Sequence, residues 1–174
     1  MTTNIPLPNA EDLLLILEQK LSPFIHPKTA IVGIHSGGAW IAERLFPRLQ
    51  AAHPQCSLEF GTLDSSFYRD DYNQRGLHAE TRPSQIPFDV EERHIILLDD
   101  VFYTGRTIRA AMNELFDYGR PASISLAVLV DRGGRELPIC PQVAALQLDI
   151  PLHQKLQLSR DEHHQLHFSL EASA

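Results

Sequence analysis

The segment 94–119 predicts a strand, a short loop and a helix in direct succession, and this order restricts the fold more than any other feature of the chain. The apolar run 95–98 has the length of a strand and ends in two carboxylates, Asp99 and Asp100. Apolar residues from Ile108 to Phe116 then recur at the spacing of one helix face, and Gly119 followed by proline predicts the end of that helix. Units of this kind are typical of α/β proteins with parallel sheets.

The rest of the chain continues the alternation. Asn9 can cap a helix with one apolar stripe that ends near Ser22, and the turn 35–38 separates a buried strand from a second helix, in which Pro47 weakens the last turn. Strands are expected at 29–34, 57–63, 94–98 and 122–130, with a short apolar piece near 143–145. We therefore expect a mainly parallel twisted sheet flanked by helices, with ligands at the carboxyl ends of the strands.

Two further segments complete a single predicted domain over residues 1–174. Residues 64–92 are polar, charged and interrupted by two prolines, and so long an irregular insertion is usually a functional flap or a mobile loop. Near the C-terminus, alternating polar and apolar residues at 155–158 and 165–170 predict two strands that can pair as a hairpin over about 153–170.

Composition excludes several classes of protein. No apolar run approaches the roughly 20 residues of a membrane-spanning helix, and the first residues lack the basic region of a secretory signal, so we expect a cytoplasmic protein without a membrane partner. The net charge of −7 argues against wholesale binding of nucleic acid. Cys56 and Cys140 lie far apart and outside any zinc-binding spacing, so both are expected to be reduced thiols in the core.

The loop after the acidic pair can bind a phosphorylated sugar. Thr104, Gly105, Arg106 and Thr107 stand at the start of a helix, where unpaired backbone N–H groups and the positive end of the helix dipole attract phosphate. The carboxylates at 99 and 100 lie about one pentose ring away and can accept hydrogen bonds from two vicinal hydroxyls. Together these groups predict a ribose 5-phosphate site.

Each half of this pattern also has a simpler interpretation. Two aspartates at the end of a strand are often a magnesium site or a solvated turn, and the sequence 104–107 is often only a helix cap. The two halves in succession are far more specific than either alone.

The 13 residues 95–107 resemble the signature of the type I phosphoribosyltransferases, which bind 5-phosphoribosyl 1-diphosphate (PRPP). The segments 67–71, 99–111, 118–124 and 129–139 look more specifically like the PyrR family of pyrimidine-operon regulators and uracil phosphoribosyltransferases. The resemblance covers about residues 31–139. It implies the type I phosphoribosyltransferase fold with a flexible flap at 64–92, Mg²⁺ bound with PRPP, and a homodimer or a larger homo-oligomer.

The resemblance also implies roles for particular residues. Asp99 and Asp100 would hold the ribose hydroxyls, and Arg69 in the flap would join them as a catalytic residue, with Arg75 and Arg82 as further diphosphate partners. The remaining groups are the substrate-binding residues Val101, Tyr103, Thr104, Gly105, Arg106 and Thr107, the pyrophosphate turn His35, Ser36, Gly37 and Gly38, and the uracil region Val130, Asp131 and Arg132. Gram-positive members carry a basic residue and an arginine in the pyrophosphate turn, whereas this chain has His35 and Gly37, a departure that bears on the efficiency of pyrophosphate handling.

Three functions follow from this resemblance. The first is a uracil phosphoribosyltransferase of pyrimidine salvage, which forms UMP and pyrophosphate from uracil and PRPP. The second is a regulator that senses UMP or PRPP and binds pyrimidine-operon mRNA. Segment 105–135 carries five arginines against three acidic residues, so we rank RNA binding below the chemistry of the pocket and expect it to depend strongly on salt. The third is a purine phosphoribosyltransferase that shares only the sugar site.

Other residues have alternative explanations. Arg132 and Arg135 can equally be surface ion-pair partners, and Trp40 near the start of a helix is expected to pack rather than to stack on a base. The residues His163, His164 and His167 suggest a metal site, but neighbours in a strand point to opposite faces, so we expect polar surface residues there.

Overall fold

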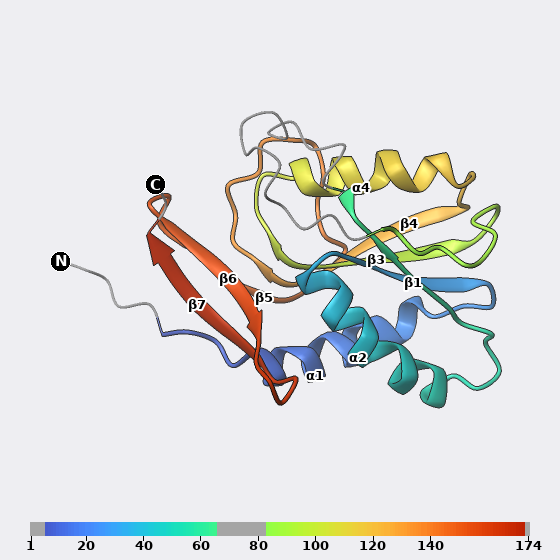
Figure 1. Cartoon of the computed structure of the whole chain (residues 1–174), viewed down its shortest axis with the longest axis horizontal. Helices are drawn as coiled ribbons and strands as arrows, with labels where there is room; N and C mark the ends of the chain where they lie inside the picture. Colours follow the sequence, from blue (N-terminus) through green and yellow to red (C-terminus); the bar gives the residue numbers. More distant parts are fainter. Residues whose placement is uncertain (1–5, 66–82, 173–174) are drawn as a thin grey trace.

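The computed structural model describes residues 6–65 and 83–172. Helices are interspersed among the first five strands, and a hairpin follows them (Figure 1). The elements are α1 (Ala10–Leu21), η1 (Ser22–Phe24), β1 (Thr29–Ile34), α2 (Gly37–Ala52), β2 (Glu59–Leu63), β3 (His94–Phe102), α4 (Arg106–Asp117), β4 (Ser123–Asp131), β5 (Val143–Gln147), β6 (Gln154–Arg160) and β7 (Leu166–Ala172). Arg69, Arg75 and Arg82 of the expected flap lie outside the described residues.

Five strands form one parallel sheet in the order β2-β1-β3-β4-β5. Helices α1 and α2 cover one face and α4 covers the other, as Figure 1 shows. Alternate residues of β3 enter the two cores, with Ile96 and Leu98 on the side of α1 and α2, and Ile95 and Leu97 on the side of α4. The expected α/β class with a mainly parallel sheet and the type I phosphoribosyltransferase fold are confirmed.

Helix boundaries follow the sequence signals closely. The side chain of Asn9 accepts hydrogen bonds from the backbone N–H groups of Glu11 (2.9 Å) and Asp12 (3.1 Å), which fixes the start of α1. Helix α2 continues past Pro47 to Ala52, beyond the point where weakening was expected. Pro47 and Glu43 are both exposed, so water can reach the backbone carbonyl that the proline leaves without an intrahelical donor.

Three sequence expectations need correction. Strand β2 begins at Glu59 rather than Ser57, and β3 continues to Phe102 rather than ending at Leu98. The acidic pair therefore lies within a paired strand, where Asp99 is opposite Val128 of β4. Cys56 is buried as expected, but Cys140 is exposed and does not belong to the core.

The segments on either side of the undescribed residues 66–82 are joined to each other and to α4. Thr62 and Gln85 exchange two backbone hydrogen bonds of 2.8 Å, and the backbone N–H of Asp64 donates to Ser84 Oγ at 2.8 Å. The Ser84 hydroxyl in turn donates to the Glu114 carboxylate of α4. Burial raises the pKa of Glu114.

Strands β6 and β7 form the expected hairpin, a separate antiparallel sheet that packs on α1 and α2. Arg44 of α2 forms an ion pair with Glu11 of α1 at 2.7 Å, and Glu11 Oε1 also accepts from the backbone N–H of Leu166 at 2.9 Å. The hydrogen bond from Arg44 lowers the pKa of Glu11. One carboxylate therefore links two helices and the hairpin. In the part of the chain that the structure describes, no helix has both the length and the apolar character needed to cross a membrane.

Candidate active site

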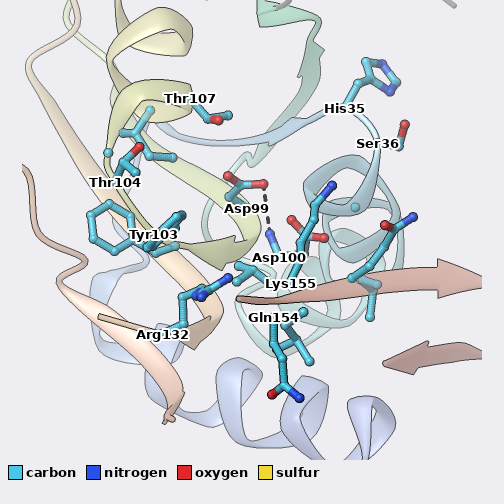
Figure 2. A pocket seen from close by; sticks show the side chains of 18 of the residues that line it. His35, Ser36, Asp99, Asp100, Tyr103, Thr104, Thr107, Arg132, Gln154 and Lys155 are labelled. Carbon is cyan, nitrogen blue, oxygen red and sulfur yellow. Dashed lines mark hydrogen bonds between the residues drawn. The ribbon is translucent and has the colours of Figure 1, made fainter. Parts of the chain in front are cut away.

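A cavity of about 570 Å³ opens at the carboxyl ends of β1, β3 and β4, and residues of the hairpin complete it (Figure 2). Eleven residues of the sequence prediction line it: His35, Ser36, Gly37, Asp99, Asp100, Val101, Tyr103, Thr104, Gly105, Thr107 and Arg132. The turn 35–38, the acidic pair, the loop 104–107 and Arg132 therefore meet in one space.

The acidic pair lies on the floor of this cavity. Asp99 is 7% exposed, and its Oδ1 accepts a hydrogen bond of 3.0 Å from the backbone N–H of Asp100. Figure 2 shows the Asp99 carboxylate between Thr107 and Asp100. Because consecutive strand residues point to opposite sides, the two carboxylates approach a ligand from different directions.

The loop 104–107 is held in place mainly by backbone conformation and backbone hydrogen bonds. Gly105 has φ +93° immediately before the first residue of α4, a conformation that favours glycine. The backbone carbonyl of Thr104 accepts hydrogen bonds from the N–H groups of Glu136 (3.0 Å) and Leu137 (3.2 Å), so the segment after β4 supports the loop. Thr104 Oγ1 accepts from the Arg106 N–H at 3.2 Å. The start of α4 therefore presents backbone donors to the cavity from a fixed position.

The turn 35–38 is in direct contact with the end of β3. A Cβ at Gly37 would lie 2.5 Å from Cγ of Asp100, and a Cβ at Gly38 would collide with the backbone carbonyl of Leu98. The peptide bond between His35 and Ser36 is cis. Both glycines are therefore needed for the turn to approach the acidic pair this closely.

The sequence left open whether Arg132 and Arg135 belong to the site or form surface ion pairs, and the structure gives a different result for each. Arg135 is exposed and forms an ion pair at 3.8 Å with Asp131, whose side chain is largely buried. Arg132 is 6% exposed, its guanidinium lies 4.2 Å from the ring centre of Tyr103, and its Nη2 reaches the carbonyls of Ile150 (3.5 Å) and Pro151 (3.4 Å). Its buried Nε has no hydrogen-bond partner among the described residues. Arg132 thus brings a buried positive charge to the cavity wall.

The remaining predicted residues lie elsewhere. Gly38, at the end of the turn, is buried and does not line the cavity, and Val130 is fully buried in the core. Arg106 donates from Nε to Glu136 at 2.9 Å on the surface, and Asp131 accepts from the backbone N–H of Gly133 at 3.0 Å. Arg69 lies outside the described residues, so its predicted role stays a prediction.

The hairpin contributes cavity residues that the sequence prediction missed. They are Leu152, Gln154, Lys155, Leu156, Gln157 and Leu158, together with Trp40 from α2. Alternation along 155–158 places Lys155 and Gln157 on one face, but it does not say what that face meets. Trp40 packs against the core, as expected, while also lining the cavity.

The three C-terminal histidines are exposed. His163 and His164 lie in the turn between β6 and β7 rather than in a strand, so the alternation argument does not apply to them. His167 pairs with Asp161 at 2.8 Å, and this contact lowers the pKa of Asp161.

Comparisons with known proteins identify the family of the chain. Residues 15–151 match the phosphoribosyl transferase domain. The "Bifunctional protein PyrR" of Nitrosococcus oceani is 50% identical over 82% of this chain and 79% of its own length, and that of Pseudomonas fluorescens is 45% identical over 88% of this chain and 90% of its own. A hypoxanthine phosphoribosyltransferase from Staphylococcus aureus has the same fold, with a TM-score of 0.58 and 21% identity over 84% of this chain and 78% of its own. The chain therefore belongs to the PyrR family, within the proteins that carry a phosphoribosyl transferase domain.

Proposed function

We propose that this chain transfers the phosphoribosyl group of PRPP to uracil and forms UMP and pyrophosphate. The observation that carries the proposal is the meeting of the acidic pair, the start of α4 and the turn 35–38 in one cavity. Membership of the PyrR family supports transfer to a pyrimidine rather than to a purine, the third function that the sequence left open.

The sugar phosphate is placed by matching its groups to the cavity. The backbone N–H groups of Gly105 and Thr107, which line the cavity at the start of α4, take the 5-phosphate. Asp99 and Asp100 accept hydrogen bonds from the two ribose hydroxyls. The diphosphate on C1 then points toward the turn 35–38, and the base lies on the side of Arg132 and the start of the hairpin.

The reaction exchanges one bond for another at C1 of the ribose. The bond from C1 to the diphosphate oxygen breaks, and its electron pair leaves on the pyrophosphate. A bond from C1 to N1 of uracil forms with the electron pair of N1, whose proton passes to water or to the departing pyrophosphate. Positive charge develops on the ribose ring in the transition state, so catalysis consists mainly of positioning, charge stabilisation and exclusion of water. Nearby carboxylates at 99 and 100 stabilise that positive charge, and no nucleophilic side chain is required.

Magnesium enters with the substrate in this scheme. The Asp99 and Asp100 carboxylates fit an ion that prefers one or two carboxylates together with substrate phosphates and water. Held by these residues, Mg²⁺ would supply positive charge to balance the departing pyrophosphate.

A base-choice assay tests the proposal. The purified protein is incubated with PRPP, Mg²⁺ and radiolabelled uracil, hypoxanthine or adenine, and the nucleotide formed is measured. We expect UMP from uracil and at least about 100-fold slower use of either purine, since a base that leaves polar groups of the site without partners is strongly rejected. Formation of a purine nucleotide at the greater rate contradicts the proposal.

A second function, regulation of transcription through pyrimidine-operon mRNA, has one observation in its favour: the curated relatives are named bifunctional. UMP or PRPP in the same cavity would control that binding in a homodimer. Filter binding of the cognate leader transcript tests it at several salt concentrations. We expect weak binding that falls steeply with salt, and tight binding at physiological salt that UMP enhances would place regulation first.

A further inference from the structure

We propose that Lys155 of β6 binds the diphosphate of PRPP and follows it as pyrophosphate leaves, so that the hairpin supplies a cation that the turn 35–38 does not carry. The inference rests on the proposed phosphoribosyl transfer, and it assigns a substrate-binding role to an element outside the signature sequence.

The charges around the cavity favour a further cation beside the Mg²⁺ that enters with the substrate. The turn 35–38 contains neither lysine nor arginine, and Gly37 lies directly against the Asp100 side chain. A diphosphate held by this turn is therefore next to two carboxylates. Like charges this close repel one another strongly where solvent is partly excluded, and backbone amides supply only partial positive charge.

Two of the described residues that line the cavity carry a lysine or arginine charge, Arg132 and Lys155. Arg132 is buried against Tyr103 and reaches the carbonyls of Ile150 and Pro151, on the side of the cavity away from the turn. Lys155 is exposed, and within the described ranges its ammonium makes no hydrogen bond or ion pair. Among the described residues that line the cavity, Lys155 is thus the cation available for a ligand near the turn.

The direction of the Lys155 side chain follows from the strand. Leu156 and Leu158 are 4% and 5% exposed and point into the core shared with α1 and α2. Alternation turns Lys155 and Gln157 to the opposite face. Figure 2 shows the Lys155 side chain directed into the cavity, toward the side where Asp100 and Ser36 lie.

The hairpin is fixed to the helix that begins at the turn. Arg160 at the end of β6 forms an ion pair with Glu43 of α2 at 3.0 Å, and its guanidinium lies 5.0 Å from the Trp40 ring centre. Strand β6 and the turn 35–38 are therefore both attached to α2. This arrangement holds Lys155 across the cavity from the turn.

A lysine suits this position chemically. Its ammonium is a compact charge with three donors on a flexible stem. It can stay close to the diphosphate oxygen that was bonded to C1 as negative charge accumulates on that oxygen. An interaction that strengthens as the leaving group departs favours the transition state over the bound substrate. Loss of Lys155 should therefore affect the diphosphate more than the nucleotide.

The test compares Lys155→Gln with Lys28→Gln, a matched change at an exposed lysine before the amino end of β1. Calorimetry measures the binding of PRPP, of pyrophosphate with Mg²⁺ and of UMP, and thermal unfolding verifies the fold. We expect Lys155→Gln to weaken PRPP and pyrophosphate about 10-fold and UMP less than about twofold, in keeping with the loss of one charged hydrogen bond. Lys155→Arg should restore part of the pyrophosphate binding, and Lys28→Gln should match the original protein.

The outcomes separate this inference from the proposed function. Unchanged binding of PRPP and pyrophosphate by Lys155→Gln overturns the inference, and so does an equal loss of UMP binding, which would place Lys155 at the base or in the folding of the hairpin. If the original protein fails to convert uracil while Lys155→Gln still loses pyrophosphate selectively, the role of Lys155 stands and the proposed reaction does not.

Discussion

The two walls of the cavity are built by different means. The sheet wall, which consists of 35–38 and 99–107, is held by backbone contacts: glycines against β3, a left-handed Gly105 and backbone hydrogen bonds to Thr104. The hairpin wall, residues 152–158, is held by buried leucines, and the hairpin is attached by the ion pair of Arg160 with Glu43 of α2 and by the hydrogen bond from the Leu166 N–H to Glu11 of α1. Close backbone contacts fix position and tolerate little change, whereas a partly exposed ion pair is weak and adjustable. The sheet wall therefore suits a sugar phosphate that must be held in one position. The hairpin wall suits a group that changes during the reaction, such as the departing diphosphate.

The largest effect is expected at the acidic pair of the sheet wall. Asp99→Asn is nearly isosteric, so the fold should remain while the charge that faces the ribose is lost. We expect turnover of PRPP to fall about 100-fold, the usual scale for one electrostatic contact to a transition state. Steady-state kinetics measure it, with Asp12→Asn in the first turn of α1 as a control. Full activity in both Asp99→Asn and Asp100→Asn would remove the ribose assignment.

Alanine variants of two neighbouring glycines separate two effects: displacement of the Asp100 side chain and distortion of the backbone. At Gly37 an added methyl meets the Asp100 side chain, which can move, so Gly37→Ala should lower activity about 10-fold or more with little loss of stability. Gly38→Ala meets the Leu98 carbonyl, which cannot move cheaply, and should lower the free energy of unfolding by about 1–3 kcal/mol. Denaturant unfolding and kinetics measure the two effects. Equal changes in activity and in the free energy of unfolding for the two variants would contradict this prediction.

The ion pair between Arg160 and Glu43 tests whether the hairpin wall needs its attachment to α2. Glu43→Arg should raise KM for PRPP a few-fold, because β6 is repelled by the new charge. The double change Glu43→Arg with Arg160→Glu restores opposite charges and should recover part of the loss. Additive losses in the double variant would show that the pair does not position the hairpin.

The smallest effect concerns Glu11, which joins α1, α2 and the hairpin. Its hydrogen bond with Arg44 lowers the pKa of Glu11 below the ordinary value of 4.5, so the ionised form stabilises the fold above that pH. We expect Glu11→Gln to cost about 1 kcal/mol at pH 7, since the pair is partly exposed. The difference should shrink as the pH falls below about 4.5, where the original carboxyl also becomes protonated. Thermal unfolding at several pH values measures it, and a difference independent of pH would exclude the ion pair as its cause.

The same contrast explains what could be predicted from sequence. Residues 95–107 and the turn 35–38 are far apart in the sequence, but each lies within a local succession of strand, loop and helix signals, so their meeting at the sheet edge follows from parallel topology. The strand pattern of 155–158 also predicts that Lys155 and Leu156 face opposite ways. It does not predict that the hairpin packs on α1 and α2, because that depends on long-range contacts such as Glu11 with Leu166. Arg132 was identified by resemblance, but its stacking on Tyr103 needed the fold.

The most direct test of the account follows backbone amides during binding of UMP. Nuclear magnetic resonance of the ¹⁵N-labelled protein reports each N–H as the nucleotide is added. We predict the largest shifts at Gly105, Arg106 and Thr107, with smaller ones near Asp99 and Asp100. A second cavity of about 610 Å³ beside β5, lined by Lys20 and Cys140 among others, provides the contrast. Shifts centred on that cavity, with the start of α4 unchanged, would contradict the placement of the sugar phosphate.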